Sequence, residues 1–100
     1  MSQQETWRVL ISSGLRGDLV VLFRKNPGIV DTIDGVARRL GVMPETIQGD
    51  VTELLGVGFL KTKHFGDKDV IYLDEEKDRQ IQESATQYLT MKQKMVGMQK

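Results

Sequence analysis

Side chains that commonly carry out catalysis or hold metals are scarce in this sequence. The 100 residues include no cysteine and a single histidine, His64. Without cysteine there is no disulfide, no thiol nucleophile and no thiolate metal site. One histidine with no second histidine or cysteine is a poor metal ligand or catalytic base. The carboxylates cluster at the expected helix starts and turns, where they have structural roles. We therefore expect no enzymatic activity, no cofactor, and no catalytic or metal site.

Five basic residues in the middle of the chain could instead bind phosphate groups. Lysine and arginine neutralise phosphates and dominate the affinity of proteins for nucleic acid. Two of these residues are adjacent and three lie in a stretch with the pattern of a β-hairpin: Arg38, Arg39, Lys61, Lys63 and Lys68. A second interpretation stays open for each, because solvated arginines can pair with nearby carboxylates and lysines on edge strands guard against aggregation.

The net charge of the chain is zero, which gives no bulk attraction for nucleic acid. Its distribution along the chain is uneven. Residues 31–58 carry five acidic and two basic side chains, whereas residues 59–73 carry three lysines against two aspartates. Any phosphate contacts must therefore come from the two arginines within the acidic segment and from the lysines that follow it.

The first half of the chain has the pattern of three helices. Leucines and a phenylalanine recur at helical spacing in LRGDLVVLFRK, and NPG ends that helix. A second helix is predicted over IVDTIDGVARRLGV, with Asp31 as its N-cap and Gly41 as a left-handed C-cap. Pro44 is expected to open a third helix, in which four apolar residues share one face: Ile47, Val51, Leu54 and Leu55.

The second half of the chain has the pattern of a β-hairpin and a long helix. From Phe59 the apolar period changes to two, which predicts strands in FLKTKH and DVIYLD around a Gly-Asp turn. Residues 74–98 then form a helix with acidic residues at its start and lysines near its end, the polarity that the helix dipole favours. The N-terminal residues 3–12 fit either a helical turn or an extended segment.

The run TIDGVARRLGVMPETIQGDVTELLGVGFL carries a family resemblance. Its small-residue helix, Gly-Val turn, Pro-Glu-Thr start and Leu-Leu ending before a hairpin are similar to the winged helix-turn-helix domains of prokaryotic transcriptional regulators. The resemblance covers residues 15–73. It implies an α+β winged helix-turn-helix domain, a three-helix core plus a β-hairpin wing, over residues 1–73. A long C-terminal helix would follow over residues 74–100.

The resemblance also implies sequence-specific binding of double-stranded DNA by a transcriptional regulator, with the helix 44–57 in the major groove. The five basic residues would then contact phosphates. Base contacts would come from the outward face of that helix: Thr46, Gln48, Gly49 and Thr52. Two other interpretations of this face stay open, because it contains no lysine or arginine. It could be a solvated surface, or a docking surface for a protein partner with weak or no DNA binding.

The length of the last helix predicts a homodimer. Residues 75–98 would extend about 36 Å, more than a domain of this size needs to cover its core. Apolar residues recur along one side, and we expect dimerisation through Ile81, Ala85, Tyr88, Leu89 and Met95. The residues beyond 92 also fit a frayed terminus. A small-molecule sensor would need a cavity between the two chains.

The overall composition is that of a globular protein, with 39% hydrophobic and 28% charged residues. The apolar run VLISSGL is too short to span a bilayer and lacks the charged lead and cleavage site of a signal peptide. We therefore expect a cytoplasmic protein that does not contact a membrane.

Overall fold

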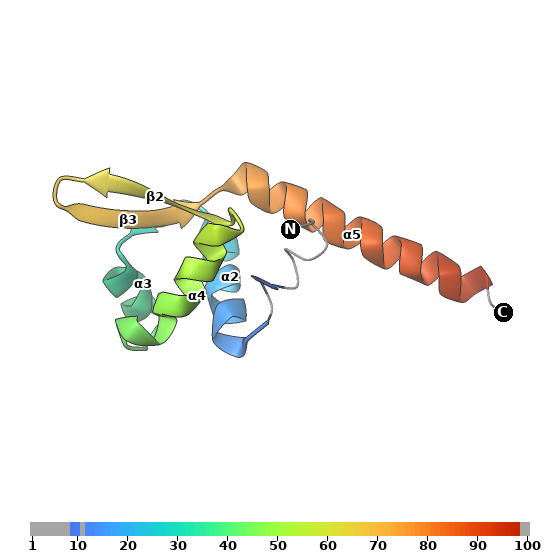
Figure 1. The fold of residues 1–100 in the computed structure, drawn as a ribbon, viewed down its shortest axis with the longest axis horizontal. Coiled ribbons are helices and arrows are strands. Elements are labelled where there is room, and N and C mark those ends of the chain that lie inside the picture. Colours follow the sequence, from blue (N-terminus) through green and yellow to red (C-terminus); the bar gives the residue numbers. More distant parts are fainter. Residues whose placement is uncertain (1–8, 11, 99–100) are drawn as a thin grey trace.

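The computed structural model describes residues 9–10 and 12–98, and it describes side-chain surroundings as far as residue 86. The fold is α+β. Its elements, in order, are α2 (Gly14–Lys25), β1 (Val30–Asp31), α3 (Ile33–Leu40), α4 (Pro44–Gly56), β2 (Leu60–Phe65), β3 (Lys68–Leu73) and α5 (Glu75–Met98). The strands form an antiparallel sheet in the order β1-β3-β2. Figure 1 shows α2, α3 and α4 on one side of this sheet, with the tip of the hairpin and the end of α5 extending in opposite directions.

Helix α2 is capped at both ends by polar side chains. Ser13 is its N-cap, and the Ser13 hydroxyl accepts a hydrogen bond from the Arg16 backbone N–H at 3.0 Å. At the other end, the backbone and side-chain N–H groups of Asn26 both donate to the Leu22 carbonyl, at 3.1 and 3.0 Å. The helix therefore ends at the NPG sequence, as its breaker residues predicted.

A tight turn joins α3 to α4. Gly41 adopts the predicted left-handed conformation, with φ of 71°, and Pro44 is the first residue of α4. The prediction of Asp31 as the N-cap of α3 was wrong. The N-cap is Thr32, whose hydroxyl accepts the Gly35 N–H at 3.1 Å. Asp31 lies in strand β1 instead, where its carboxylate accepts the Thr32 N–H at 2.8 Å.

The hairpin formed by β2 and β3 ends in a two-residue turn, as predicted. Gly66 has φ of 62° and Asp67 does not have positive φ, which fits a type II′ turn with glycine at its first central position. Leu60 pairs with Leu73 at the base of the hairpin, and both are buried. Residues 61–69 are all exposed. Only the base of the hairpin thus belongs to the core, and the rest projects as a wing.

One hydrophobic core joins the helices to the base of the sheet. Helices α2, α3 and α4 contribute the apolar faces that their sequence periods predicted, and the fully buried side chains include Leu19, Phe23, Val36, Ile47, Leu54, Phe59 and Leu60. Leu10, from the segment before α2, is buried in the same core at 1% exposure. Ile81 of α5 is also part of it. Burial of these residues fixes α4 against α2, α3 and β2.

Helix α5 follows β3 after a single residue, Asp74. The Asp74 carboxylate accepts the Lys77 N–H at 3.1 Å and so caps the helix, while the Asp74 N–H donates to the Phe59 carbonyl at 3.0 Å. Figure 1 shows the first turns of α5 beside the domain and the remainder leading away from it. The molecule is 58 Å long and 24 Å wide as a result.

The α+β class, the order of the elements and the long last helix agree with the sequence-based prediction, and the arrangement is compatible with a winged helix. Strand β1 was not predicted. Among the described helices, none combines the length and the apolar character needed to cross a membrane.

Candidate nucleic-acid interface

The outward face of α4 presents the polar residues predicted to contact bases. Thr46, Gln48, Gly49 and Thr52 are all exposed. The Thr52 hydroxyl donates to the Gln48 carbonyl at 2.9 Å, so the Thr52 oxygen keeps acceptor capacity. At Gly49, a Cβ would meet nothing within 4 Å. Another molecule could therefore approach the helix backbone closely at this point.

Helix α4 as a whole is less acidic than its sequence suggests, because Asp50 is paired with Arg16 of α2. Arg16 Nε donates to Asp50 Oδ1 at 2.9 Å, and the two side chains are only 15% and 16% exposed. The Arg16 guanidinium also donates to the Val9 carbonyl at 3.0 Å and to the Ser12 hydroxyl at 2.7 Å. Arg16 thus ties α4 to α2 and to the segment before it. Arg16 was not among the residues predicted to have a role.

Arg38 and Arg39 occupy the last turn of α3, and both are exposed. Arg39 Nε lies 3.5 Å from Asp31 Oδ2, and the arginine side chain remains 50% exposed. No ion pair links Arg38 to another residue in the described part of the chain. An incoming phosphate could contact Arg38 directly, whereas at Arg39 it would have to replace or share the Asp31 carboxylate.

The three lysines of the wing differ in their partners. Lys61 Nζ lies 3.1 Å from Asp74 Oδ2, and the hydrogen bond to Asp74 raises the pKa of Lys61. The Lys63 ammonium lies 5.5 Å from the centre of the Phe65 ring. Lys68 pairs with Phe65 across the hairpin and is exposed. Lys63 and Lys68 form no ion pair with the described residues, so the tip of the wing carries two available cations.

His64 pairs with Asp69 across the hairpin, and both side chains are largely exposed. A histidine and one carboxylate are too few ligands for a metal site. Within the described residues, no group of three or more histidine, aspartate or glutamate side chains could hold a metal ion.

The residues predicted to form the dimer contact lie in different surroundings. Ile81 is fully buried in the core of its own chain, so its assignment to the dimer contact is corrected: it anchors α5 to the domain. Ala85 is partly exposed. The other three, Tyr88, Leu89 and Met95, lie outside the residues whose side chains the structure describes.

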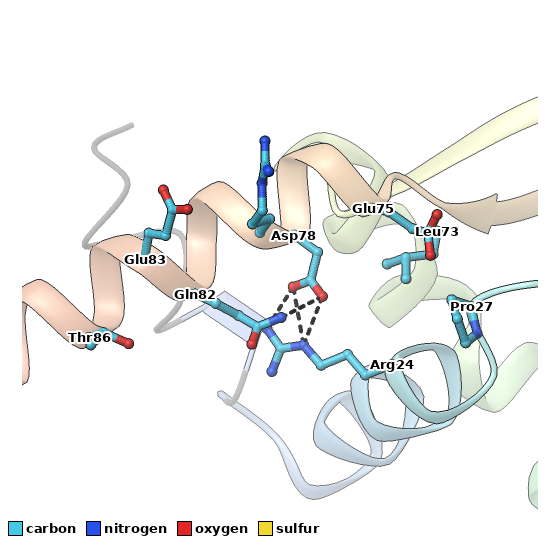
Figure 2. A pocket seen from close by; sticks show the side chains of 9 residues that line it. Arg24, Pro27, Leu73, Glu75, Asp78, Gln82, Glu83 and Thr86 are labelled. Atoms are coloured by element: carbon cyan, nitrogen blue, oxygen red, sulfur yellow. Dashed lines mark hydrogen bonds and ion pairs between the residues drawn. The ribbon is translucent and has the colours of Figure 1, made fainter.

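An ion pair between the buried Asp78 and the partly exposed Arg24 holds the base of α5 against α2, beside an open depression (Figure 2). Arg24 Nη2 donates to Asp78 Oδ1 at 2.7 Å, and Arg24 Nε lies 3.1 Å from both carboxylate oxygens. The Gln82 amide donates to Asp78 Oδ2 at 3.0 Å, and Asp78 is only 4% exposed. Both oxygens of the buried carboxylate are thus satisfied by the chain itself. We interpret the depression as the surroundings of a structural ion pair rather than as a ligand site.

One feature of the sequence could have indicated that Asp78 is buried and paired. It lies three residues before Ile81 on the same helix, and residues three apart share a helix face. A carboxylate on a buried face requires a cationic partner. The identity of that partner, Arg24, could not be read from the sequence because 54 residues separate the two.

Comparison of the chain with protein-family models and with curated proteins finds no match.

Proposed function

We propose that the chain binds double-stranded DNA in a sequence-specific way, as a transcriptional regulator of the winged helix-turn-helix type in the cytoplasm. The protein would act by binding, without catalysis. The observation that carries it is the arrangement of cations around α4. This helix packs against α3 and β2, which supply Arg38, Lys61 and Lys63. Lys68 is the first residue of β3, the strand paired with β2. Among these, Arg38, Lys63 and Lys68 are exposed and form no ion pair with the described residues.

In the proposed complex, α4 enters the major groove with its exposed polar face toward the bases. Glutamine can bond adenine through two hydrogen bonds, and threonine can contact a thymine methyl group, so Gln48, Thr46 and Thr52 are suited to reading base edges. The open space at Gly49 lets the helix backbone come close to the DNA. The flanking cations would bind phosphates and set the register of the helix along the duplex.

Fluorescence anisotropy of the full chain with a random-sequence duplex tests this proposal. We expect binding at about 50 mM salt that weakens at about 150 mM, because phosphate neutralisation releases counterions. Arg38→Ala, Lys63→Ala and Lys68→Ala should each weaken binding. Arg79→Ala is the matched control, since it removes the same charge from α5, where Arg79 pairs with Glu76. Equal losses in all four variants would argue against a defined surface around α4.

We also propose that the regulator acts as a homodimer through α5. The support is the length of this 24-residue helix, which leads away from the domain, and the apolar spacing of its sequence beyond Thr86. Two copies of α4 would then meet half-sites about one turn of DNA apart, which favours a palindromic operator.

Sedimentation equilibrium measures the oligomeric state directly. The wild-type chain is expected to have twice the mass of one chain, and Leu89→Glu should reduce it to the mass of a monomer by placing a charge in the apolar stripe. Gln87→Glu, which adds the same charge off the stripe, should leave the dimer intact. A monomeric wild-type chain would contradict this part of the proposal.

A second candidate function is a docking module for a basic protein partner. The observation that favours it is the composition of α4, which contains no lysine or arginine and exposes Glu45 and Glu53. The anisotropy experiment separates the two functions, because this alternative predicts no duplex binding even at about 50 mM salt. Affinity capture of a partner, lost in Glu45→Gln/Glu53→Gln, would then support docking.

A further inference from the structure

The tip of the wing carries an aromatic residue that lies outside the hydrophobic core. Phe65 is 56% exposed, and the register places it next to the two-residue turn, opposite Lys68. The hairpin has no core beneath it here, because residues 61–69 are all exposed. Leaving much of a phenylalanine side chain in water forgoes burial that stabilises proteins. Much of the Phe65 ring is therefore available to a partner outside the chain.

The two nearest cations share a face of the hairpin with Phe65. Lys63 precedes it by two residues on β2, so both side chains project from the same side, and the Lys63 ammonium lies 5.5 Å from the ring centre. Lys68 is the cross-strand partner of Phe65 and projects from that side as well. Asp69 belongs to the opposite face, where it pairs with His64. One face of the tip thus combines an aromatic ring with two ammonium groups.

This combination matches the chemistry of the DNA minor groove. Sugars form its walls, phosphates line its two edges, and proteins that bind there insert apolar side chains between base steps. The two lysines come from different strands of the hairpin and flank the ring, so they can meet phosphates on either side of the groove. The two-residue turn keeps the end of the hairpin narrow.

We infer that Phe65 is an apolar wedge that the wing inserts into the minor groove, with Lys63 and Lys68 on the flanking phosphates. This inference rests on the proposed DNA-binding function and deepens it. Partial unstacking costs least at flexible pyrimidine–purine steps, so Phe65 would add sequence preference without any hydrogen bond to a base. The amino group of guanine, which occupies the minor groove, would oppose insertion.

Duplexes that contain inosine in place of guanine provide the test. An inosine·cytosine pair lacks the minor-groove amino group and keeps the major-groove pattern of a guanine·cytosine pair. We expect the full wild-type chain to bind the inosine duplex about tenfold more tightly than its guanine counterpart, the scale of one base–aromatic contact. Phe65→Ala should abolish this difference, whereas Phe65→Trp should retain it. Lys63→Ala should weaken binding to both duplexes equally and keep their ratio.

The outcomes separate this inference from the function on which it rests. Salt-dependent binding with equal affinity for the two duplexes, unchanged by Phe65→Ala, would overturn the wedge and leave the DNA-binding proposal standing. Absence of duplex binding by the wild-type chain at about 50 mM salt would overturn both. Binding to phosphatidylglycerol vesicles that depends on Phe65, without a preference for the inosine duplex, would assign the tip to an anionic lipid surface and overturn the wedge. Since Phe65 is exposed, thermal unfolding of Phe65→Ala should match that of the wild-type chain.

Discussion

Arg16 and Arg24 both belong to α2, and each joins this helix to a distant element through an aspartate. Arg16 bonds Asp50 of α4, and Arg24 bonds Asp78 of α5. Arg24 also lies over the Phe59 ring, with 5.7 Å between its guanidinium carbon and the ring centre. Guanidinium groups suit these positions because they donate several hydrogen bonds in a fixed geometry. The two pairs make α2 the element against which both predicted functional helices are oriented.

Removal of Arg24 should destabilise the protein more than removal of Arg79, whose side chain is more exposed. Arg24→Ala leaves the carboxylate of Asp78, which is 4% exposed, with only Gln82 as a side-chain donor. Breaking a buried pair costs about 3–5 kcal/mol, and the partial exposure of Arg24 lowers the expected loss in unfolding free energy to about 2 kcal/mol. Urea denaturation measures this loss. Arg79→Ala, which breaks an exposed pair with Glu76, should cost less than about 1 kcal/mol. Equal losses would show that the Arg24 pair is not effectively buried.

The pKa of Asp74 predicts how stability changes in acid. Hydrogen bonding from the Lys77 backbone N–H lowers the pKa of Asp74, and Lys61 lowers it further. The folded chain therefore releases this proton more readily than the unfolded chain. The resulting stabilisation is present above the unfolded pKa of about 3.9, and it is lost as the pH falls through the lower folded pKa.

Asp74→Asn tests this assignment, because asparagine still caps a helix but does not titrate. Between about pH 5 and pH 2, the melting temperature of the variant should fall less steeply than that of the wild-type chain. Asp67→Asn, in the exposed hairpin turn, serves as the control and should follow the wild-type curve. Parallel curves for wild type and Asp74→Asn would mean that Asp74 does not contribute to acid unfolding.

At the scale of the elements, the features that depend only on neighbouring residues were predicted from the sequence. The αL turn at Gly41, the start of α4 at Pro44 and the Gly66-Asp67 turn depend on a few neighbouring residues, and all three are confirmed. The exposure of the α4 face followed from the apolar period of the same helix and is also confirmed. The contact of that face with DNA stays a prediction.

Features that depend on distant partners were missed. Strand β1 has two residues and exists because Val30 and Asp31 pair with Tyr72 and Ile71 of β3. The N-cap of α3 was misassigned because Asp31, a strong capping residue by type, is held in that strand and paired with Arg39. Ile81 fitted the apolar stripe of α5, and nothing in its spacing distinguished contact with its own core from contact with a second chain.

Replacement of a glycine by alanine should change the stability of the protein in opposite directions in α3 and in α4. Glycine inside a helix costs about 1 kcal/mol relative to alanine, so Gly49→Ala, which fills open space, should raise the unfolding free energy by about that amount. At Gly35 a Cβ would overlap the Asp31 carboxylate, which bonds the Thr32 N–H and pairs with Arg39. Gly35→Ala should therefore destabilise the protein.

Chemical denaturation of the two alanine variants checks this difference. The double variant Asp31→Ala/Gly35→Ala should recover part of the loss, because the overlapping carboxylate is gone. Equal stability changes at the two glycines would show that Asp31 moves aside at little cost. Gly17→Ala, in open space on α2, provides a second stabilising control outside the proposed DNA surface.

At the scale of the whole molecule, the internal ion pairs limit how many cations can meet DNA. Arg38, Lys63 and Lys68 lack ion-pair partners among the described residues, whereas Arg39 and Lys61 are paired with aspartates. Each neutralised phosphate contributes about −0.9 to the slope of log affinity against log salt. We therefore expect a slope of about −3 for each bound chain.

Asp74→Asn should release Lys61 and steepen that slope by about one, since one more cation becomes available. Glu76→Gln is the matched control, because it removes the same charge but releases Arg79 on α5. Anisotropy titrations across a range of salt concentrations measure both effects. An equal change in the two variants would indicate a response to net charge rather than to the availability of Lys61.

The connection between the wing and α5 is short and is held by hydrogen bonds. Asp74 alone separates β3 from α5, and it is bonded to Phe59, to Lys77 and to Lys61. A dimer joined through α5 would therefore hold its two DNA-binding domains at a fixed distance and orientation, unlike two domains joined by a flexible linker. Lengthening the spacer between half-sites by about five base pairs, half a turn, would carry one half-site to the far side of the double helix. On this lengthened operator a rigid dimer would lose the DNA contacts of one whole protomer, whereas a flexibly linked dimer could still bind both half-sites.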